Sequence, residues 1–211
     1  MLKSLSLESF GNAVASEEAV PGGGSVSALA AGLAASLTAM VATMTLKKEK
    51  FHDVAPLMTE IREKASSLQN ELMDAVDQDA DSYRQVLAAF RLPKSTEEEK
   101  AVRKDAIQAA FKHAAIVPLQ VAQAAVKVIK LAGQVAHRGN PDMITDAGVG
   151  VLMARSAALG ALMNVAINLG SLKDRALVEE LRQKVEETRN EVIHKESEIL
   201  MKISFDGLLK V

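Results

Sequence analysis

The chain has 211 residues, enough for one domain with a sizeable core or for two small domains. Its formal net charge of −2 excludes the strongly basic surface typical of nucleic-acid-binding proteins, and the absence of Cys excludes disulfides and thiol chemistry. Ala, Leu, Val and charged residues dominate, and this composition favours helices. The first five residues lack the apolar run of a signal peptide. We expect a cytoplasmic, all-α protein.

The hydrophobic pattern predicts helices along the whole chain and no convincing strand. They span residues 4–16, 26–46, 57–91, 96–137, 144–169 and 173–202. The first helix is amphipathic, with an apolar face made of Leu5, Phe10, Ala13 and Val14. Pro118 is expected to kink or restart the fourth helix, and residues 204–207 are expected to end the last one. Because no long linker divides the chain, we expect a single domain over residues 1–211.

A glycine-rich loop precedes the second predicted helix. It reads Pro21-Gly22-Gly23-Gly24-Ser25. Three successive glycines cost backbone entropy, so the loop must need a backbone without Cβ atoms. Ser25 is expected to cap a helix that begins at Val26, where free N–H groups and the helix dipole can hold an anion or a ligand carbonyl. The alternative is a tight turn that permits close helix packing.

Two predicted helices are apolar nearly all round, over residues 26–46 and 144–169. The first is long enough to span a bilayer, and no second uncharged run of that length is expected. Ala, Ser, Thr and Gly dominate it, which suits close helix contacts, so we expect a buried helix of a soluble bundle and no membrane partner. The expected space-filling residues are Leu33, Leu37, Met40, Val41 and Met44. A homo-oligomer would enclose both helices, although a thick single-chain bundle would also serve.

Helical phase singles out one carboxylate on the long helix over residues 57–91. Its apolar stripe is Leu68, Leu72, Val76, Tyr83, Val86, Leu87 and Phe90. Asp79 falls on this stripe, whereas Asp77 and Asp81 lie about 200° to either side and are expected to point outward. A buried carboxylate has a raised pKa and is a candidate general base. The alternative role for Asp79 is a structural hydrogen bond to a neighbouring helix.

Other polar residues are weaker candidates. Asn140 lies in a second glycine-containing loop, and Asp146, just beyond it, could simply complement a helix dipole. Asn164 and Asn168 are four residues apart and share one helix face, where buried amides need backbone or ligand partners; alone they favour a structural role. The four His residues have no metal-ligand spacing, so we expect no metal.

Several of these motifs, in order, resemble a known family. The glycine loop and the helix start after it resemble the opening of the formiminotetrahydrofolate cyclodeaminase and methenyltetrahydrofolate cyclohydrolase family. The likeness continues through residues 76–83 and 91–93, then Val117-Pro118-Leu119, Gly139-Asn140, Asp146 and residues 164–169, and so covers nearly the whole chain. We expect one departure, namely that this chain stands alone without the formiminotransferase domain that some members carry.

The resemblance implies an all-α, mostly antiparallel helical fold that forms a homodimer and binds a folate near the glycine loop, with no cofactor besides this substrate. The family's catalytic acid, the second Asp of an Asp-X-Asp pattern, falls on Asp79, the residue that helical phase selects independently. The folate's glutamate tail is anionic and could meet Lys47 and Lys48, whose alternative role is to complement a helix C-terminus. The expected substrate-binding residues are Gly22, Gly23, Gly24, Ser25, Lys47, Lys48, Asn140, Asp146, Asn164 and Asn168.

Two reactions fit such a site. In cyclodeamination N10 of 5-formiminotetrahydrofolate attacks the formimino carbon and ammonia leaves; in cyclohydrolysis water opens the methenyl bridge to give 10-formyltetrahydrofolate. Asp79 is suited to accept the proton in either, and the sequence favours cyclodeamination by a small margin. A hypothesis of another class is a non-catalytic helical scaffold or folate-binding relative, which would need neither Asp79 nor three glycines.

Overall fold

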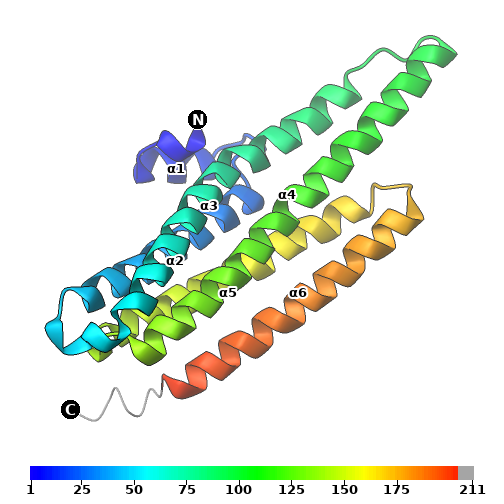
Figure 1. Cartoon of the computed structure of the whole chain (residues 1–211). Helices are drawn as coiled ribbons and strands as arrows, with labels where there is room; N and C mark the ends of the chain where they lie inside the picture. Colours follow the sequence, from blue (N-terminus) through cyan, green and yellow to red (C-terminus); the bar gives the residue numbers. More distant parts are fainter. Residues whose placement is uncertain (204–211) are drawn as a thin grey trace.

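The computed structural model describes residues 1–203, and all regular elements within them are helical (Figure 1). They are η1 Leu2–Ser4, α1 Leu7–Val14, α2 Gly23–Leu46, η2 Glu49–Val54, α3 Ala55–Phe90, α4 Glu97–Arg138, η3 Pro141–Met143, α5 Ile144–Leu169 and α6 Arg175–Lys202. The predicted all-α class is confirmed. The predicted end of the last helix at residues 204–207 lies outside the described residues.

The five long helices form an elongated antiparallel bundle (Figure 1). The closest-packed pairs are α2 with α3, α4 with α5, and α2 with α5. The far ends of α3 and α4 project beyond the other helices as a hairpin, whose turn is closed by a capping box between Thr96 and Glu99. This arrangement places the start of α2 beside the C-terminal halves of α3 and α5.

Small residues let α2 and α5 approach closely. Ala28, Ala31, Ala34 and Ala35 of α2 are fully buried, as are Ala154, Ala158 and Ala161 of α5. A Cβ on Gly150 would lie 3.5 Å from the Ala34 carbonyl oxygen, so the two backbones are nearly in contact. The apolar character of both helices thus serves helix packing, as expected.

Within a single chain, one face of these two helices is exposed. Leu33, Met40 and Met44 of α2, expected to fill the interior, are 42%, 36% and 37% exposed. The exposed apolar residues of the two helices are Val26, Leu33, Met40, Met44, Val149, Leu152, Met163 and Ile167, which we call the α2/α5 apolar face. The remaining helices of one chain cover only the opposite sides of α2 and α5.

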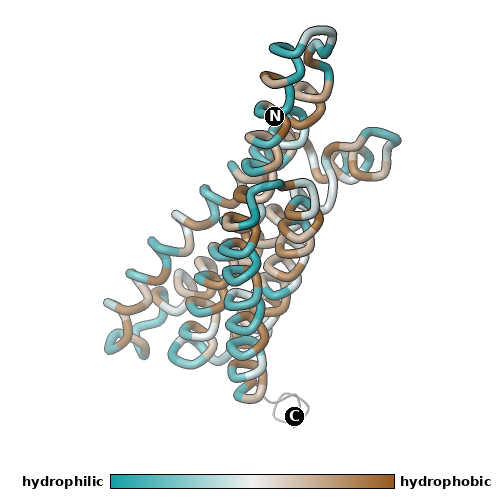
Figure 2. Tube along the Cα trace, turned by 90° about the vertical axis from the view of Figure 1, so that its right-hand side faces the viewer, coloured by the Kyte–Doolittle hydropathy of each residue, from teal (hydrophilic) through white to brown (hydrophobic). Residues whose placement is uncertain are grey.

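The N-terminal helix is shorter than predicted, and its apolar face differs. Phe10 is buried, but Leu5 and Val14 are 42% and 38% exposed. The chain begins with the short helix η1, which contacts α3, so only part of the predicted amphipathic helix reaches the bundle. The charged helix α6, which leads to the C-terminus in Figure 2, mixes hydrophilic and hydrophobic turns as a helix at the edge of a bundle should.

Helix α4 continues without interruption through Pro118, so of the two predicted outcomes the restart is wrong. Proline has no N–H, so the carbonyl of Ala114, four residues earlier, loses its intrahelical donor. Asn168 of α5 supplies a replacement, because its Nδ2 donates to the Ala114 oxygen at 2.9 Å. A side chain from a neighbouring helix therefore supplies the hydrogen bond that the proline nitrogen cannot donate.

Three helical segments have the length and apolar composition of membrane spans, namely Gly23–Leu46, Glu97–Arg138 and Pro141–Leu169. Residues 26–46 are still the longest run among them without a charged residue, but the other two segments also have the apolar composition of a span. Within the bundle, half of the apolar window of Gly23–Leu46 and 72% of that of Glu97–Arg138 are buried. Much of this apolar surface is therefore used in contacts between helices.

Candidate active site

A cavity of about 370 Å³ lies where the start of α2 meets α3, α4 and α5. Its lining residues are Ala19, Val20, Gly22, Gly23, Gly24, Asp79, Ser82, Tyr83, Phe111, Ala114, Asn164, Ile167, Asn168 and Ser171. The glycine loop, Asp79 and the two α5 amides, which are far apart in the sequence, thus share one cavity. We call it the Asp79 cavity.

Asp79 is half-buried in the wall of this cavity and is held by the first turn of α2. The Ser25 hydroxyl donates to Asp79 Oδ2 at 2.9 Å and also lies 3.1 Å from the Val76 carbonyl oxygen. A hydroxyl has one proton, so these two acceptors share it. The backbone N–H of Ser25 is a further donor to the carboxylate.

Ser25 is not the helix cap that the sequence predicts. Helix α2 begins two residues earlier, at Gly23, and Gly22 occupies the N-cap position without a capping side chain. The Ser25 side chain is therefore turned across to α3, where it is fully buried against Asp79. Its hydroxyl thus donates to an acid on the neighbouring helix and does not accept from the free N–H groups of α2, as a capping side chain would.

Burial raises the pKa of Asp79 above its ordinary value of 3.8, because a charged carboxylate is poorly solvated in the cavity wall. The hydrogen bonds from the Ser25 hydroxyl and N–H oppose this rise, since both stabilise the charged form. A carboxylate with a raised pKa, open to a cavity and fixed by two donors, is suited to accept a proton from a bound molecule.

Gly24 gives Asp79 the space it occupies. A Cβ at position 24 would lie 2.6 Å from Asp79 Oδ2 and closer still to Oδ1. At Gly23, by contrast, the nearest group to a Cβ is Asn164 Nδ2 at 3.6 Å, an ordinary contact. The two glycines therefore differ in role. The absence of a side chain at Gly24 leaves room for the Asp79 carboxylate, and its absence at Gly23 leaves the cavity open beside the Asn164 amide.

Of the two acids that flank Asp79 on α3, only Asp81 lies where the sequence predicts. Asp81 is exposed and pairs with Arg84 at 2.6 Å. Asp77, expected to point outward, is half-buried: its Oδ1 accepts from the backbone N–H of Leu2, and its Oδ2 is buried with no hydrogen-bond partner among residues 1–203. The prediction for Asp77 is wrong because η1 covers that side of α3, a contact that a single-helix pattern cannot show.

The two amides of α5 face the cavity while their NH₂ groups bond to backbone. Asn164 Nδ2 donates to the Gly160 carbonyl at 2.9 Å, and Asn168 Nδ2 donates to the carbonyls of Ala114 and Asn164. Their Oδ1 atoms accept no hydrogen bond from the described part of the chain. Each amide therefore offers an acceptor to a molecule in the cavity.

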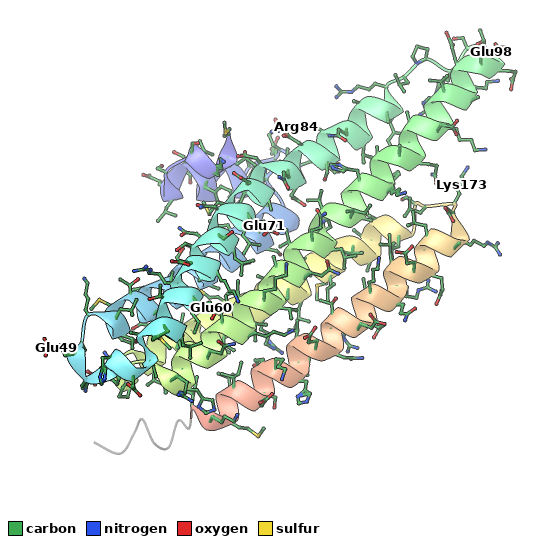
Figure 3. All side chains as sticks on the ribbon, in the orientation of Figure 1. Glu49, Glu60, Glu71, Arg84, Glu98 and Lys173 are labelled. Atoms are coloured by element: carbon green, nitrogen blue, oxygen red, sulfur yellow. The ribbon has the colours of Figure 1, made fainter. Side chains whose placement is uncertain are left out.

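The other four predicted contact residues lie at the opposite end of the bundle. Lys47 and Lys48 follow the C-terminus of α2, and Lys48 pairs with Asp142 at 2.6 Å. Asn140 is buried in the connection to α5, where its N–H donates to Thr45 Oγ1, and Asp146 lies in the first turn of α5. In Figure 3, Glu49 marks this end and Lys173 the end of α5 nearer to the Asp79 cavity. Within one chain these four residues do not join that cavity.

Sequence reasoning missed several cavity residues. The helical pattern puts Tyr83, Leu87 and Phe90 on the apolar stripe of α3, yet they are 40%, 38% and 47% exposed, and Tyr83 lines the cavity. Phe111, Ile167 and Ser171 also line it. The spacing of Tyr83 four residues after Asp79 was the one available signal, since it puts both on the same face. No group of three or more potential metal ligands occurs among residues 1–203.

Comparison with known proteins identifies the family. The family model described as formiminotransferase-cyclodeaminase matches residues 6–187. The chain belongs to this family. The resemblance read from the glycine loop and the later motifs is therefore confirmed.

Relatives within the family carry two different names. The methenyltetrahydrofolate cyclohydrolase of Methylorubrum extorquens is 38% identical over 180 residues, which cover 85% of this chain and 86% of that protein. The formimidoyltransferase-cyclodeaminase of Gallus gallus is 36% identical over 179 residues, which cover 85% of this chain but only 33% of that longer protein. The chain thus matches about a third of the length of such bifunctional relatives.

A solved structure of the family has the same fold. The crystal structure of formiminotetrahydrofolate cyclodeaminase from Thermotoga maritima superposes with a TM-score of 0.85 and 27% sequence identity, covering 94% of this chain and 96% of that one. The relatives named here are enzymes of folate one-carbon chemistry, so this family member is an enzyme of the same group.

Proposed function

We propose that the Asp79 cavity binds a tetrahydrofolate carrying one carbon on N5 or between N5 and N10, and that Asp79 is the proton acceptor of its reaction. The observation that carries this proposal is the seating of Asp79: it is desolvated, open to the cavity, and fixed by Ser25 at 2.9 Å. The oxygens of Asn164 and Asn168 are free to accept from N–H groups of the pterin ring.

We favour hydrolysis of 5,10-methenyltetrahydrofolate, because the relative of similar length, matched over 86% of its own chain, is named a cyclohydrolase. Water attacks the methenyl carbon and gives one proton to Asp79. The bond from this carbon to N5 then breaks, and N5 keeps the electron pair and takes the proton back from Asp79. The hydroxyl on the carbon loses its proton to solvent as the carbonyl of 10-formyltetrahydrofolate forms, so one proton is released overall.

The second candidate is cyclodeamination, which the sequence alone favoured and which the Thermotoga maritima structure, matched over 96% of its chain, supports. N10 of 5-formiminotetrahydrofolate attacks the formimino carbon and passes its proton to Asp79. The nitrogen of the former imine takes up protons and leaves as ammonia, and the methenyl bridge remains. Both reactions need one group that accepts and returns a proton, which matches the single carboxylate of the cavity.

An absorbance assay of methenyl-folate separates the candidates. With methenyltetrahydrofolate at mildly alkaline pH, a cyclohydrolase makes the signal fall faster than the blank. With 5-formiminotetrahydrofolate, a cyclodeaminase makes it rise and releases ammonia. No change with either substrate would contradict the enzyme proposal and would favour a folate-binding scaffold.

We also propose that the protein is a homodimer joined by the α2/α5 apolar face. Val26, Leu33 and Met40 follow one another at seven-residue intervals and so lie on one side of α2. Together with the exposed residues of the adjacent helix α5 they form a contiguous apolar surface of the kind that marks subunit contacts. A second copy covers it with the same residues, which accounts for two helices that are apolar on both the inner and outer sides.

A further inference from the structure

Pro118 is buried in the middle of α4, where a proline deprives the helix of one backbone hydrogen bond. The carbonyl that lacks a donor belongs to Ala114, which lines the Asp79 cavity. Its replacement donor is Asn168, and α5, which carries this residue, packs closely along α4 (Figure 1). Pro118 does not itself line the cavity, but it acts on the hydrogen bonds of a residue that does.

The side-chain amide of Asn168 has two N–H donors, and both are directed at backbone carbonyls. Nδ2 lies 2.9 Å from the Ala114 oxygen and 2.8 Å from the Asn164 oxygen. Turning the amide over would place Oδ1 against these two oxygens and would leave the Ala114 carbonyl without a donor. The two carbonyls therefore determine that Oδ1, and not the NH₂ group, faces the cavity.

The two carbonyls do not constrain the amide equally. The Asn164 oxygen also has the backbone N–H of Asn168 as its ordinary helical donor, so it does not need the side chain. The Ala114 oxygen has no such backbone donor, because the residue four positions later is Pro118. The larger part of the constraint on the Asn168 amide thus comes from the proline.

We propose that Pro118 is a positioning residue, which acts through Asn168 to make this wall of the cavity a hydrogen-bond acceptor. The Asn164 amide, one turn earlier, has the same polarity, since its Nδ2 donates to the Gly160 carbonyl at 2.9 Å. Two acceptor oxygens on one face of α5 select ligands that present N–H groups. A reduced pterin presents them at N3, at N8 and at its 2-amino group. This inference rests on the proposed function and adds to it a residue that does not touch the folate.

The test measures the Kd of 5-formyltetrahydrofolate by calorimetry, and kcat and KM with the substrate that the wild type uses. In Pro118→Ala the backbone regains an N–H for the Ala114 carbonyl, so the Asn168 amide loses its main constraint. We expect Kd and KM to rise about 2- to 10-fold, the range of one net hydrogen bond. The value of kcat should change little, because Ser25 still holds Asp79. Pro56→Ala, which removes an exposed proline from the first turn of α3, should match the wild type.

Asn168→Ala separates positioning from a merely structural role. It removes the acceptor, so it should also weaken binding, and Pro118→Ala should cause no further loss of binding in this background. Losses that add would show that Pro118 affects the cavity by another route and would overturn the inference. A Pro118→Ala variant that binds like the wild type would overturn it as well. Circular dichroism checks that each variant is folded.

If the wild type turns over neither folate substrate and does not bind 5-formyltetrahydrofolate, the proposed function fails instead. Nuclear magnetic resonance then tests the positioning of the amide by itself, through the solvent exchange of the Asn168 side-chain N–H groups. Slower exchange in the wild type than in Pro118→Ala supports the positioning, and equal exchange in the two proteins contradicts it.

Discussion

Gly24 and Asp79 fit each other so closely that a Cβ at position 24 would lie 2.6 Å from Oδ2 and closer to Oδ1, so any larger residue there requires the carboxylate to move. We predict that Gly24→Ala displaces the carboxylate and lowers kcat by about 10²-fold, the cost of misplacing a catalytic group by about 1 Å. Steady-state kinetics with methenyltetrahydrofolate measures this loss.

Gly23→Ala is the matched comparison. Its Cβ would make an ordinary 3.6 Å contact with Asn164 Nδ2, and alanine favours a helix over glycine. We expect this variant to raise KM, because the methyl group enters the cavity, with a smaller effect on kcat than Gly24→Ala has. Equal kcat values for Gly24→Ala and the wild type would contradict the seating of Asp79 by position 24.

The Ser25 hydroxyl predicts a shift in pH dependence. It lowers the pKa of Asp79 by bonding to the charged form, so its removal raises that pKa further. Activity that needs the ionised carboxylate rises as pH increases through this pKa. In Ser25→Ala the acidic limb of the pH–kcat profile should therefore move to higher pH.

A suitable control is Ser36→Ala, which removes a hydroxyl from the same helix. Ser36 Oγ donates to the Gly32 carbonyl of its own helix, away from Asp79. Its profile should match that of the wild type. If Ser25→Ala left the acidic limb in place, the hydrogen bond to Asp79 would not set the pKa that governs turnover.

Asn168 and Pro118 should be energetically coupled through the Ala114 carbonyl. Asn168→Ala leaves that buried carbonyl without a donor, at a cost of about 1–3 kcal/mol in the free energy of unfolding. Pro118→Ala restores a backbone N–H for the same carbonyl, so Asn168→Ala should cost less in the Pro118→Ala background. Urea unfolding of the four proteins gives the coupling energy, and additive effects would show that Asn168 does not replace the missing donor.

The subunit interface can be tested by adding charge to the α2/α5 apolar face. Leu33→Asp/Met40→Asp should convert the protein to a 22.5 kDa monomer in sedimentation experiments, because the two carboxylates would be buried between subunits. Leu7→Asp/Val102→Asp places the same charges at exposed apolar residues outside this face and should leave the dimer intact. A wild type that sediments as a monomer at micromolar concentration would contradict the homodimer.

The hydrophobic periodicity of the sequence predicts those features of the fold that depend on a single helix. The range of α5, the selection of Asp79 and the outward position of Asp81 all follow from spacing along a single helix. The same spacing gives the wrong position for Asp77, because η1, which is distant in sequence, covers it. Ser25 has the sequence position of a cap, but its hydrogen-bond partner lies on α3. Contacts between segments that are distant in sequence determine the surroundings of both residues, and helical phase carries no information about such contacts.

The predicted contact residues separate for a similar reason. The glycine loop, Asn164 and Asn168 meet at the Asp79 cavity, whereas Lys47, Lys48, Asn140 and Asp146 gather at the other end of the long helices. The order of the motifs along the chain does not predict at which end of an antiparallel bundle each motif lies. The residues that the sequence did not single out, such as Tyr83 and Phe111, owe their place in the cavity to the crossing of α3, α4 and α5.

The central claim is that Asp79 accepts the proton, and Asp79→Asn tests it most directly because asparagine keeps the size and removes the base. The measurement is kcat with methenyltetrahydrofolate and with 5-formiminotetrahydrofolate, beside the exposed control Asp81→Asn. Asp77→Asn is not a neutral control, since Asp77 accepts a hydrogen bond from Leu2. We predict that kcat on the substrate used by the wild type falls about 10²–10⁴-fold in Asp79→Asn, with KM and circular dichroism little changed, and stays near the wild-type value in Asp81→Asn. A folded Asp79→Asn variant with near-normal kcat would contradict the account.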